Sequence, residues 1–214
     1  MRGKDSRGNW RSPFNPLLAT SPMNNPGDYT EANAWQYFWT PALHDIDGMM
    51  QLLGGKKHFT AQLDSFFTIQ AQNPNKHLGQ EALIGQYAHG NEPSHHVAYL
   101  YSYSDKPDRG REIITKICSE FYGNNSNGMI GNDDCGQMSA WYIFSTLGFY
   151  PVNPVSGEYI IGQPQTKSAI VHLKDGKILK ITNNNTKLVT LNGLQVSDLK
   201  LTHKQVSTGG LLNF

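Results

Sequence analysis

Two adjacent carboxylates, Asp133 and Asp134, stand before a predicted helix in a segment of polar and aromatic residues, 131–141. Another acid, Glu31, lies far upstream among tyrosines and tryptophans. Surrounding rings favour a carboxyl group that keeps its proton, whereas a helix start favours an ionised aspartate. One protonated and one ionised carboxyl form the pair that hydrolysis of a glycosidic bond needs. This interpretation makes Glu31 the general acid and Asp134, or its neighbour Asp133, the general base.

Each of these acids also has a purely structural explanation. Asp134 followed by Gln137 fits a capping box at the start of a helix. Glu31 after Thr30 fits an exposed acid in a first helical turn. The two explanations of the doublet are compatible, because one aspartate can cap the helix while the other faces a cleft.

A third polar cluster combines three histidines with an acid and an amide. His95 and His96 are adjacent and point to different faces, so they do not favour a shared zinc ion. Asn91 and Glu92 offer oxygen ligands, which suit Ca²⁺. The alternative is a helix cap beside buried, hydrogen-bonded histidines.

The composition excludes several classes of protein. Lys+Arg number 18 against 17 for Asp+Glu, and this balance lacks the basic excess typical of nucleic-acid or anionic-membrane binding. No apolar run approaches the ~20 residues of a membrane-spanning helix, and the sequence starts without a signal peptide. The two cysteines, Cys118 and Cys135, are too few for a metal cluster and are expected to be reduced packing residues.

Apolar periodicity predicts helices through most of the chain up to residue 150. Asp45 is placed to cap a helix that contains Ile46 and Leu53, and Gly54 to stop it. The same 3.6-residue pattern predicts further helices over 59–67, 93–103, 107–121 and 138–147.

The composition changes after Pro151, where β-branched residues alternate with polar ones. The sequence predicts a hairpin turn at 174–177 and strands over 178–181, 188–191, 199–202 and 211–214. The expected fold is therefore mainly α, with helical hairpins over 1–150 followed by a β-rich tail over 151–214.

Three motifs in this order resemble glycoside hydrolase family 92, the calcium-dependent, inverting exo-α-mannosidases. They are Thr30-Glu31-Ala32-Asn33-Ala34-Trp35-Gln36-Tyr37, residues 85–96 and residues 131–141. The resemblance extends over essentially the whole chain. It implies the C-terminal part of an (α/α)6 catalytic toroid, whose second half precedes strands that pack on an N-terminal β-sandwich domain outside this sequence.

The resemblance also implies roles for individual residues. Glu31 matches the general acid and Asp134 the general base, with Asp133 as the alternative. Calcium and the terminal mannose are associated with the second motif. The expected calcium ligands are Asn91 and Glu92 of that motif, together with Asp134 of the third motif. Residues expected to contact the sugar are Trp35, Gln36, His89, His95, Gln137 and Trp141.

The implied activity is Ca²⁺-assisted hydrolysis of terminal α-mannosidic bonds in N-glycans or mannans with inversion, by default of α-1,2 bonds. A glutamate rather than a glutamine at position 31 favours an ordinary glycosidic bond over a mannosyl phosphodiester. The family implies a periplasmic or secreted enzyme. The alternative is an inactive gene fragment or a remnant that only binds carbohydrate, because half a toroid leaves apolar faces uncovered.

Overall fold

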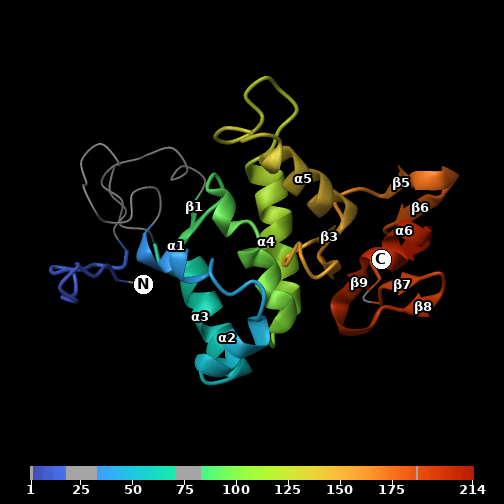
Figure 1. The fold of residues 1–214 in the computed structure, drawn as a ribbon. Helices are drawn as coiled ribbons and strands as arrows, with labels where there is room; N and C mark the ends of the chain where they lie inside the picture. The colour runs from blue at the N-terminus through green and yellow to red at the C-terminus, as the bar shows by residue number, and fades with distance from the viewer. Residues whose placement is uncertain (1, 18–32, 71–82, 187) are drawn as a thin grey trace. The chain divides into compact units, whose positions relative to one another are not determined.

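The computed structural model describes residues 2–17, 33–70, 83–186 and 188–214 (Figure 1). The chain forms two compact units. The first unit comprises Met1–Val97 and Phe121–Met138, and the second comprises Ala98–Glu120 and Ser139–Phe214.

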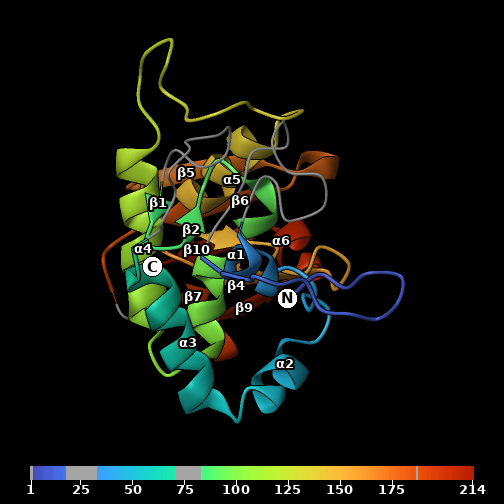
Figure 2. The same ribbon diagram turned by 90° about the vertical axis from the view of Figure 1, so that its left-hand side faces the viewer.

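Helices lie near the start of the first unit, and the second and third of them form where the sequence predicts them. They are α1 (Ala34–Phe38), α2 (Ile46–Leu52) and α3 (Lys56–Thr68). Asp45 caps α2 as predicted, since its carboxylate accepts a 2.8 Å hydrogen bond from the Gly48 amide. Both views show α2 and α3 as neighbours joined by a short connection (Figure 1 and Figure 2).

An aromatic cluster forms the core of the first unit. Trp39 is 1 % exposed and meets the rings of Phe59 and Phe66 edge to face. Leu63 is also fully buried, so the predicted apolar stripe of α3 faces this core. These contacts fix the segment that follows the first motif.

The predicted helix over 93–103 has a tighter geometry than expected. The segment forms two 3-10 helices, η1 (Glu92–Ser94) and η2 (Val97–Tyr103). Pro93 lies in the first turn of η1, where its missing N–H costs no hydrogen bond. Short β-strands β1 (Leu83–Ile84) and β2 (Tyr87–Ala88) pair antiparallel just before this segment.

The second unit contains two longer helices. Helix α4 (Pro107–Glu120) buries Ile113, Ile114 and Ile117, as the periodicity predicts. Helix α5 (Gln137–Leu147) begins with two residues of the first unit and continues in the second. It ends at Gly148, whose φ of 96° suits glycine at a helix end.

The second unit also contains two sheets. A three-stranded sheet has the order β3-β4-β9, and a five-stranded sheet has the order β5-β6-β10-β7-β8. The strands are β3 (Phe149–Tyr150), β4 (Glu158–Ile161), β5 (Ser168–His172), β6 (Ile178–Thr182), β7 (Thr190–Leu191), β8 (Leu194–Gln195), β9 (Lys200–Thr202) and β10 (Gly210–Asn213). The remaining elements here are η3 (Lys174–Gly176), η4 (Ser197–Leu199) and α6 (His203–Thr208).

The predicted hairpin and strands of the tail are confirmed, although the strand predicted over 188–191 is shorter. The last strand, β10, pairs parallel to β6 and antiparallel to β7, so it lies inside the sheet. Leu179, Ile181 and Leu212 are buried in the apolar cluster that this arrangement creates.

The fold combines helices and strands, and the predicted half toroid stays a prediction. The compact units group α4 and most of α5 with the sheets, and the predicted domain boundary at residue 150 stays a prediction. None of the helices in the described residues has the length and apolar character needed to cross a membrane.

Candidate active site

Gln86, in the second motif, anchors the first motif to the second. Its side-chain oxygen accepts a 2.6 Å hydrogen bond from the Asn33 amide, and its backbone carbonyl accepts one of 2.7 Å from Gln36. Asn33 and Gln36 also form a capping box at the start of α1. All three side chains are buried, so these polar contacts replace hydration lost on folding. Gln36, predicted to contact sugar, is engaged in this structural role.

The second and third motifs also meet in the first unit. The side-chain amide of Gln137 donates a 3.1 Å hydrogen bond to Nδ1 of His95. A methyl group in place of the Gly131 hydrogen would lie 3.9 Å from the Cα of Gly90, so the two backbones run close together. The tertiary structure thus brings together, within the first unit, the described residues of the first two motifs and residues 131–138 of the third.

The fully buried His89 lies in a chain of hydrogen bonds that includes the half-buried Tyr122. The Tyr122 hydroxyl donates to the Met138 carbonyl at 3.1 Å and therefore accepts from Nε2 of His89 at 2.7 Å. Nδ1 of His89 is then the acceptor for the Tyr87 hydroxyl at 2.8 Å. This arrangement assigns His89 the neutral tautomer with its proton on Nε2.

Burial and hydrogen bonding also favour the neutral form of His95 and His96. Nε2 of His95 donates to the His89 carbonyl at 3.0 Å, and Nε2 of His96 donates to the Trp39 carbonyl at 2.8 Å. Desolvation lowers the pKa of His89 to about 2 and that of both other histidines to about 4. The prediction of buried, hydrogen-bonded histidines is confirmed, and their predicted sugar contacts stay a prediction.

Asp133 and Asp134 lie in a tight loop just before α5. The Asp133 carbonyl accepts hydrogen bonds from the amides of Gly136 at 3.1 Å and Met138 at 3.2 Å. Asp134, Cys135 and Gly136 all have positive φ, at 44°, 58° and 91°. Non-glycine residues avoid this region, and such strain often accompanies functional sites. Asp134 is exposed and Asp133 is half-buried, so both are accessible to a reactant.

Glu31 lies outside the described residues. Its separation from Asp133 and Asp134 therefore stays a prediction. Asn33, two positions later in the sequence, is held by the hydrogen bond to Gln86.

Trp35 and Trp141, which are predicted to contact the sugar, differ in their surroundings, and Trp39 follows the first motif. Trp39 and Trp141 are at most 1 % exposed, and Trp141 packs in the second unit against Tyr99 and Tyr150. Trp35 is half-buried and lines a hollow of about 360 Å³ in the first unit, together with Trp10. Trp35 is thus the one of these three rings that retains an accessible face in the described structure.

The predicted calcium ligands offer oxygen atoms but no acidic cluster. Asn91 is buried and Glu92 is half-buried at the start of η1, where the Ser94 hydroxyl is also enclosed. In the described ranges, no group of three His, Cys, Asp or Glu side chains is arranged to hold a metal ion. The amide, carboxylate and hydroxyl oxygens of this turn fit a hard cation such as Ca²⁺ in their chemistry.

Both cysteines are free, and they differ in exposure. Cys118 is buried on α4, whereas Cys135 is exposed in the aspartate loop. The expectation that both are reduced packing residues is therefore wrong for the packing of Cys135. Its place in a left-handed turn between Asp134 and Gly136 explains why its side chain points away from a core.

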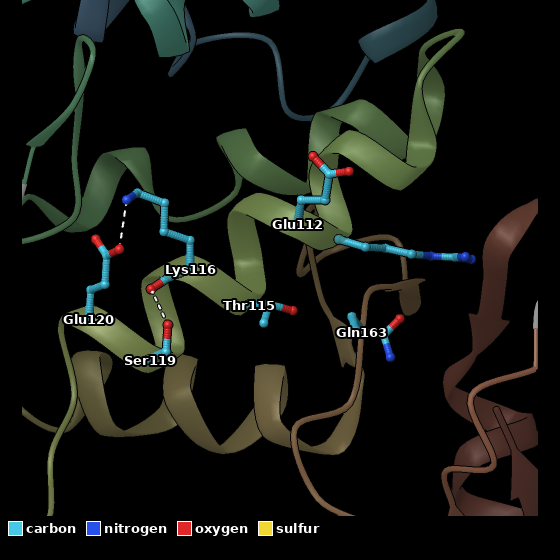
Figure 3. A pocket seen from close by; sticks show the side chains of 7 residues that line it. Glu112, Thr115, Lys116, Ser119, Glu120 and Gln163 are labelled. Carbon is cyan, nitrogen blue, oxygen red and sulfur yellow. Dashed lines mark hydrogen bonds and ion pairs between the residues drawn. The ribbon is translucent and has the colours of Figure 1, made fainter.

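A hollow of about 470 Å³ runs along α4 in the second unit (Figure 3). Its lining includes Lys116 and Glu120, which form a 2.7 Å ion pair, and Gln163. None of the described site residues lines this hollow. Its charged side chains are engaged in ion pairs on α4, so we assign it no catalytic role.

Comparison with known proteins identifies the family. The sequence model of the glycosyl hydrolase family 92 catalytic domain matches residues 1–214. The chain belongs to glycosyl hydrolase family 92. The motifs gathered around Gln86 and His89 are therefore those of a family 92 catalytic domain.

Solved structures of family 92 members resemble the chain over its full length. The GH92 α-mannosidase BT3965 of Bacteroides thetaiotaomicron, in complex with mannoimidazole, is 39 % identical with a TM-score of 0.88. The inverting mannosidase BT2199 of the same organism is 34 % identical with a TM-score of 0.80. The chain covers 29 % and 30 % of these two proteins.

A curated relative of Arthroderma benhamiae is described as an uncharacterized secreted glycosidase. It is 28 % identical over 200 residues, which cover 88 % of this chain and 24 % of that protein. The family 92 chain thus spans about a quarter of this relative's length.

Sequence reasoning missed the residues that hold the site together. Gln86 lies within a quoted motif, but its role as an anchor depends on contacts with Asn33 and Gln36, which are distant in sequence. Tyr122 follows the end of α4 without any pattern that distinguishes it from a packing residue. Only the folded chain places its hydroxyl between His89 and Met138.

Proposed function

We propose that this chain forms part of an exo-acting α-mannosidase that hydrolyses terminal α-mannosidic bonds with inversion. The observation that carries the proposal is the set of hydrogen bonds that joins residues of all three motifs within the first unit. There the accessible Asp133 and Asp134 precede Gln137, which donates to the buried His95. Membership of family 92 supports it, as do relatives described as α-mannosidases.

The proposed reaction is a direct displacement. Glu31 protonates the leaving oxygen, while Asp134, or alternatively Asp133, removes a proton from a water on the opposite face of the sugar. Inversion requires the two carboxyl groups to stand about 6.5–9.5 Å apart, which leaves room for that water. The exposed position of Asp134 supports its access to solvent water.

Calcium is proposed as the cofactor, held by oxygen atoms of Asn91, Glu92 and Asp134. When bound, it would polarise sugar hydroxyl groups as a Lewis acid. The polar turn of η1 supports this assignment, because amide and carboxylate oxygens are preferred calcium ligands. The nearby histidines are buried and neutral, so they add no positive charge that would repel a cation.

The remaining assignments follow the family. We propose a mannose-containing glycan such as an N-glycan or mannan as substrate, with α-1,2 bonds as the default linkage. The parent enzyme would be secreted or periplasmic, as the secreted glycosidase relative suggests. An N-terminal β-sandwich domain of the parent chain is the proposed structural partner.

A second candidate is a non-catalytic fragment or a sugar-binding remnant. Large apolar side chains are strongly exposed in both units: Leu52 is 91 % exposed in the first and Val155 is 93 % exposed in the second. Each exposed side chain of this size forgoes about 1.5–3 kcal/mol of burial energy. These exposures, together with the chain's coverage of its relatives, favour an isolated chain with little or no activity.

A chimera separates the two candidates. In this chimera the 214 residues replace the matching part of BT3965. The rest of BT3965 then supplies the part of a family 92 enzyme that this chain does not cover. We expect the chimera to release mannose from α-1,2-mannobiose in the presence of Ca²⁺, and the isolated chain to release little or none. A folded chimera without turnover would refute the catalytic proposal, as would turnover that persists in Glu31→Gln.

A further inference from the structure

The hydroxyl of Tyr122 connects the second motif to the loop that carries Asp133 and Asp134. We propose that Tyr122 is a positioning residue for this aspartate pair, acting through Met138 on one side and His89 on the other. The role of Tyr122 in catalysis rests on the proposed function. Its role in holding the aspartate loop can be tested without measuring any activity.

The Tyr122 hydroxyl both donates and accepts a hydrogen bond. Its proton points to the Met138 carbonyl at 3.1 Å, and its oxygen accepts the Nε2 proton of His89 at 2.7 Å. His89 is held in turn by the Tyr87 hydroxyl on β2, at 2.8 Å from Nδ1. Since His89 is fully buried, loss of this partner would leave its N–H without hydration.

Met138 transmits this restraint to the aspartates. Its amide donates to the Asp133 carbonyl at 3.2 Å, while its own carbonyl accepts from Tyr122. Met138 is therefore the single residue that links the backbone of Asp133 to the Tyr122 hydroxyl through hydrogen bonds. Gln137, the neighbour of Met138, donates to His95 and ties the same turn to the same motif.

The loop needs such a restraint because its conformation is intrinsically unfavourable. Asp134 and Cys135 both adopt positive φ, a conformation in which the Cβ atom of a non-glycine residue crowds the backbone. Strained backbone of this kind persists only where surrounding contacts determine it. The hydrogen bonds at Met138 and Gln137 are contacts of this kind, at the C-terminal edge of the loop.

Replacing Tyr122 with Phe isolates the hydroxyl from the ring. The ring meets His89 edge to face at 5.4 Å, and phenylalanine retains that contact. The Tyr122 backbone is held independently by a bridge to Met129. Tyr122→Phe therefore removes two hydrogen bonds and little packing.

Tyr99→Phe is the matched control. The Tyr99 hydroxyl is buried and lies 2.7 Å from Ser145 Oγ, so it also holds α5, but in the second unit. Both variants lose one tyrosine hydroxyl that binds the same helix. A general loosening of α5 would affect them equally.

Amide hydrogen exchange in the 214-residue chain tests the structural part. We expect exchange at Gly136, Gln137 and Met138 to accelerate by about tenfold in Tyr122→Phe and to stay unchanged in Tyr99→Phe. Three results would overturn the proposal. The first is that these amides are already unprotected in the unsubstituted chain. The others are that Tyr122→Phe exchanges at the same rate as the unsubstituted chain, or that both variants accelerate exchange equally.

Substitutions of His89 provide a second test that keeps Tyr122 intact. Glutamine places an amide N–H where Nε2 of His89 lies, whereas the shorter asparagine does not reach Tyr122. We expect His89→Asn to accelerate exchange at Met138 more than His89→Gln does. The same exchange rate in both would contradict a role that passes through the Nε2 to hydroxyl hydrogen bond.

The chimera with BT3965 tests the catalytic part. We expect Tyr122→Phe to lower kcat by about tenfold with KM within about twofold, because a displaced base affects the reaction more than binding. Unchanged kcat beside accelerated exchange would refute positioning of the base. If the unsubstituted chimera is folded but inactive, the proposed function fails, and the exchange result alone then decides whether Tyr122 holds the loop.

Discussion

The side-chain amide of Asn33 lies 2.6 Å from the side-chain oxygen of Gln86, and both side chains are almost completely buried. This contact joins the motif that contains Glu31 to the motif that contains the histidines. A buried amide pair of this kind costs more to break than it contributes when intact, because each partner left alone lacks hydration.

Loss of the Asn33–Gln86 contact is expected to destabilise the chain. We predict that Asn33→Ala lowers the free energy of unfolding by about 1–3 kcal/mol, as measured by urea denaturation. Asn184→Ala is the control, because Asn184 makes a similar 2.7 Å hydrogen bond to Asn213 at an exposed position and should change stability by less than about 0.5 kcal/mol. Equal effects of the two substitutions would show that burial of the pair is unimportant.

The three buried histidines predict a loss of stability on mild acidification. Burial lowers the pKa of His89, His95 and His96 in the folded chain below the ordinary value of 6.5. The unfolded chain therefore takes up protons first as the pH falls, so the stability is complete above about pH 6.5 and decreases below it. Each histidine contributes a slope of about 1.4 kcal/mol per pH unit, which persists to about pH 4 for His95 and His96.

Urea midpoints measured between pH 7.5 and 4.5 check this slope. His96→Gln keeps an N–H for the Trp39 carbonyl but cannot be protonated, so it should reduce the pH dependence by about a third. The exposed His172 is the control, and His172→Gln should leave the slope unchanged. A flat stability over this range would contradict neutral buried histidines.

The two cysteines should differ sharply in reactivity. Burial raises the pKa of the Cys118 thiol to about 12, so its reactive thiolate is scarce at neutral pH. Cys135 is exposed, and an aromatic disulfide reagent should modify it at least about a hundredfold faster. Mass spectrometry of Cys118→Ser and Cys135→Ser identifies the fast site. Rapid labelling of both thiols in the unsubstituted chain would show that α4 is not packed as described.

The proposed acid and base predict large losses of turnover in the chimera. Glu31→Gln and Asp134→Asn should each lower kcat by about 10²–10⁴, the usual contribution of general acid–base catalysis. Asp133→Asn should cost less if Asp134 is the base. Asp175→Asn is a suitable control, because asparagine tolerates the φ of 60° at that turn. A larger loss for Asp133→Asn would reverse the assignment of the two aspartates.

Calcium is expected to stabilise the chain as well as to support activity. Saturating Ca²⁺ at about a hundredfold over Kd adds about 2.7 kcal/mol to the stability of a state that binds it. Chelation should therefore lower the melting temperature of the unsubstituted chain. Glu92→Gln should abolish that dependence, since it removes the carboxylate from the proposed ligand set. The same melting temperature with Ca²⁺ and with chelator would remove calcium from the proposal.

The sequence was sufficient for the local elements. Asp45 and Gly54 predicted the limits of α2, and apolar spacing predicted α3, α4 and α5, because each signal acts within one or two turns. Alternation predicted the strands of the tail. The three motifs were sufficient for the family, since they are contiguous runs of sequence.

Only the tertiary structure decided which strands, turns and side chains are neighbours. The inner position of β10, the tight 3-10 turns after Pro93 and the positive φ of Asp134 all depend on neighbours far away in the chain. Hydrogen bonds such as that between Tyr122 and His89 join residues that no local periodicity relates. Their formation depends on closing long loops around a shared core. The free energy of such loop closure depends on residues far apart in the chain, so no short stretch of sequence predicts it.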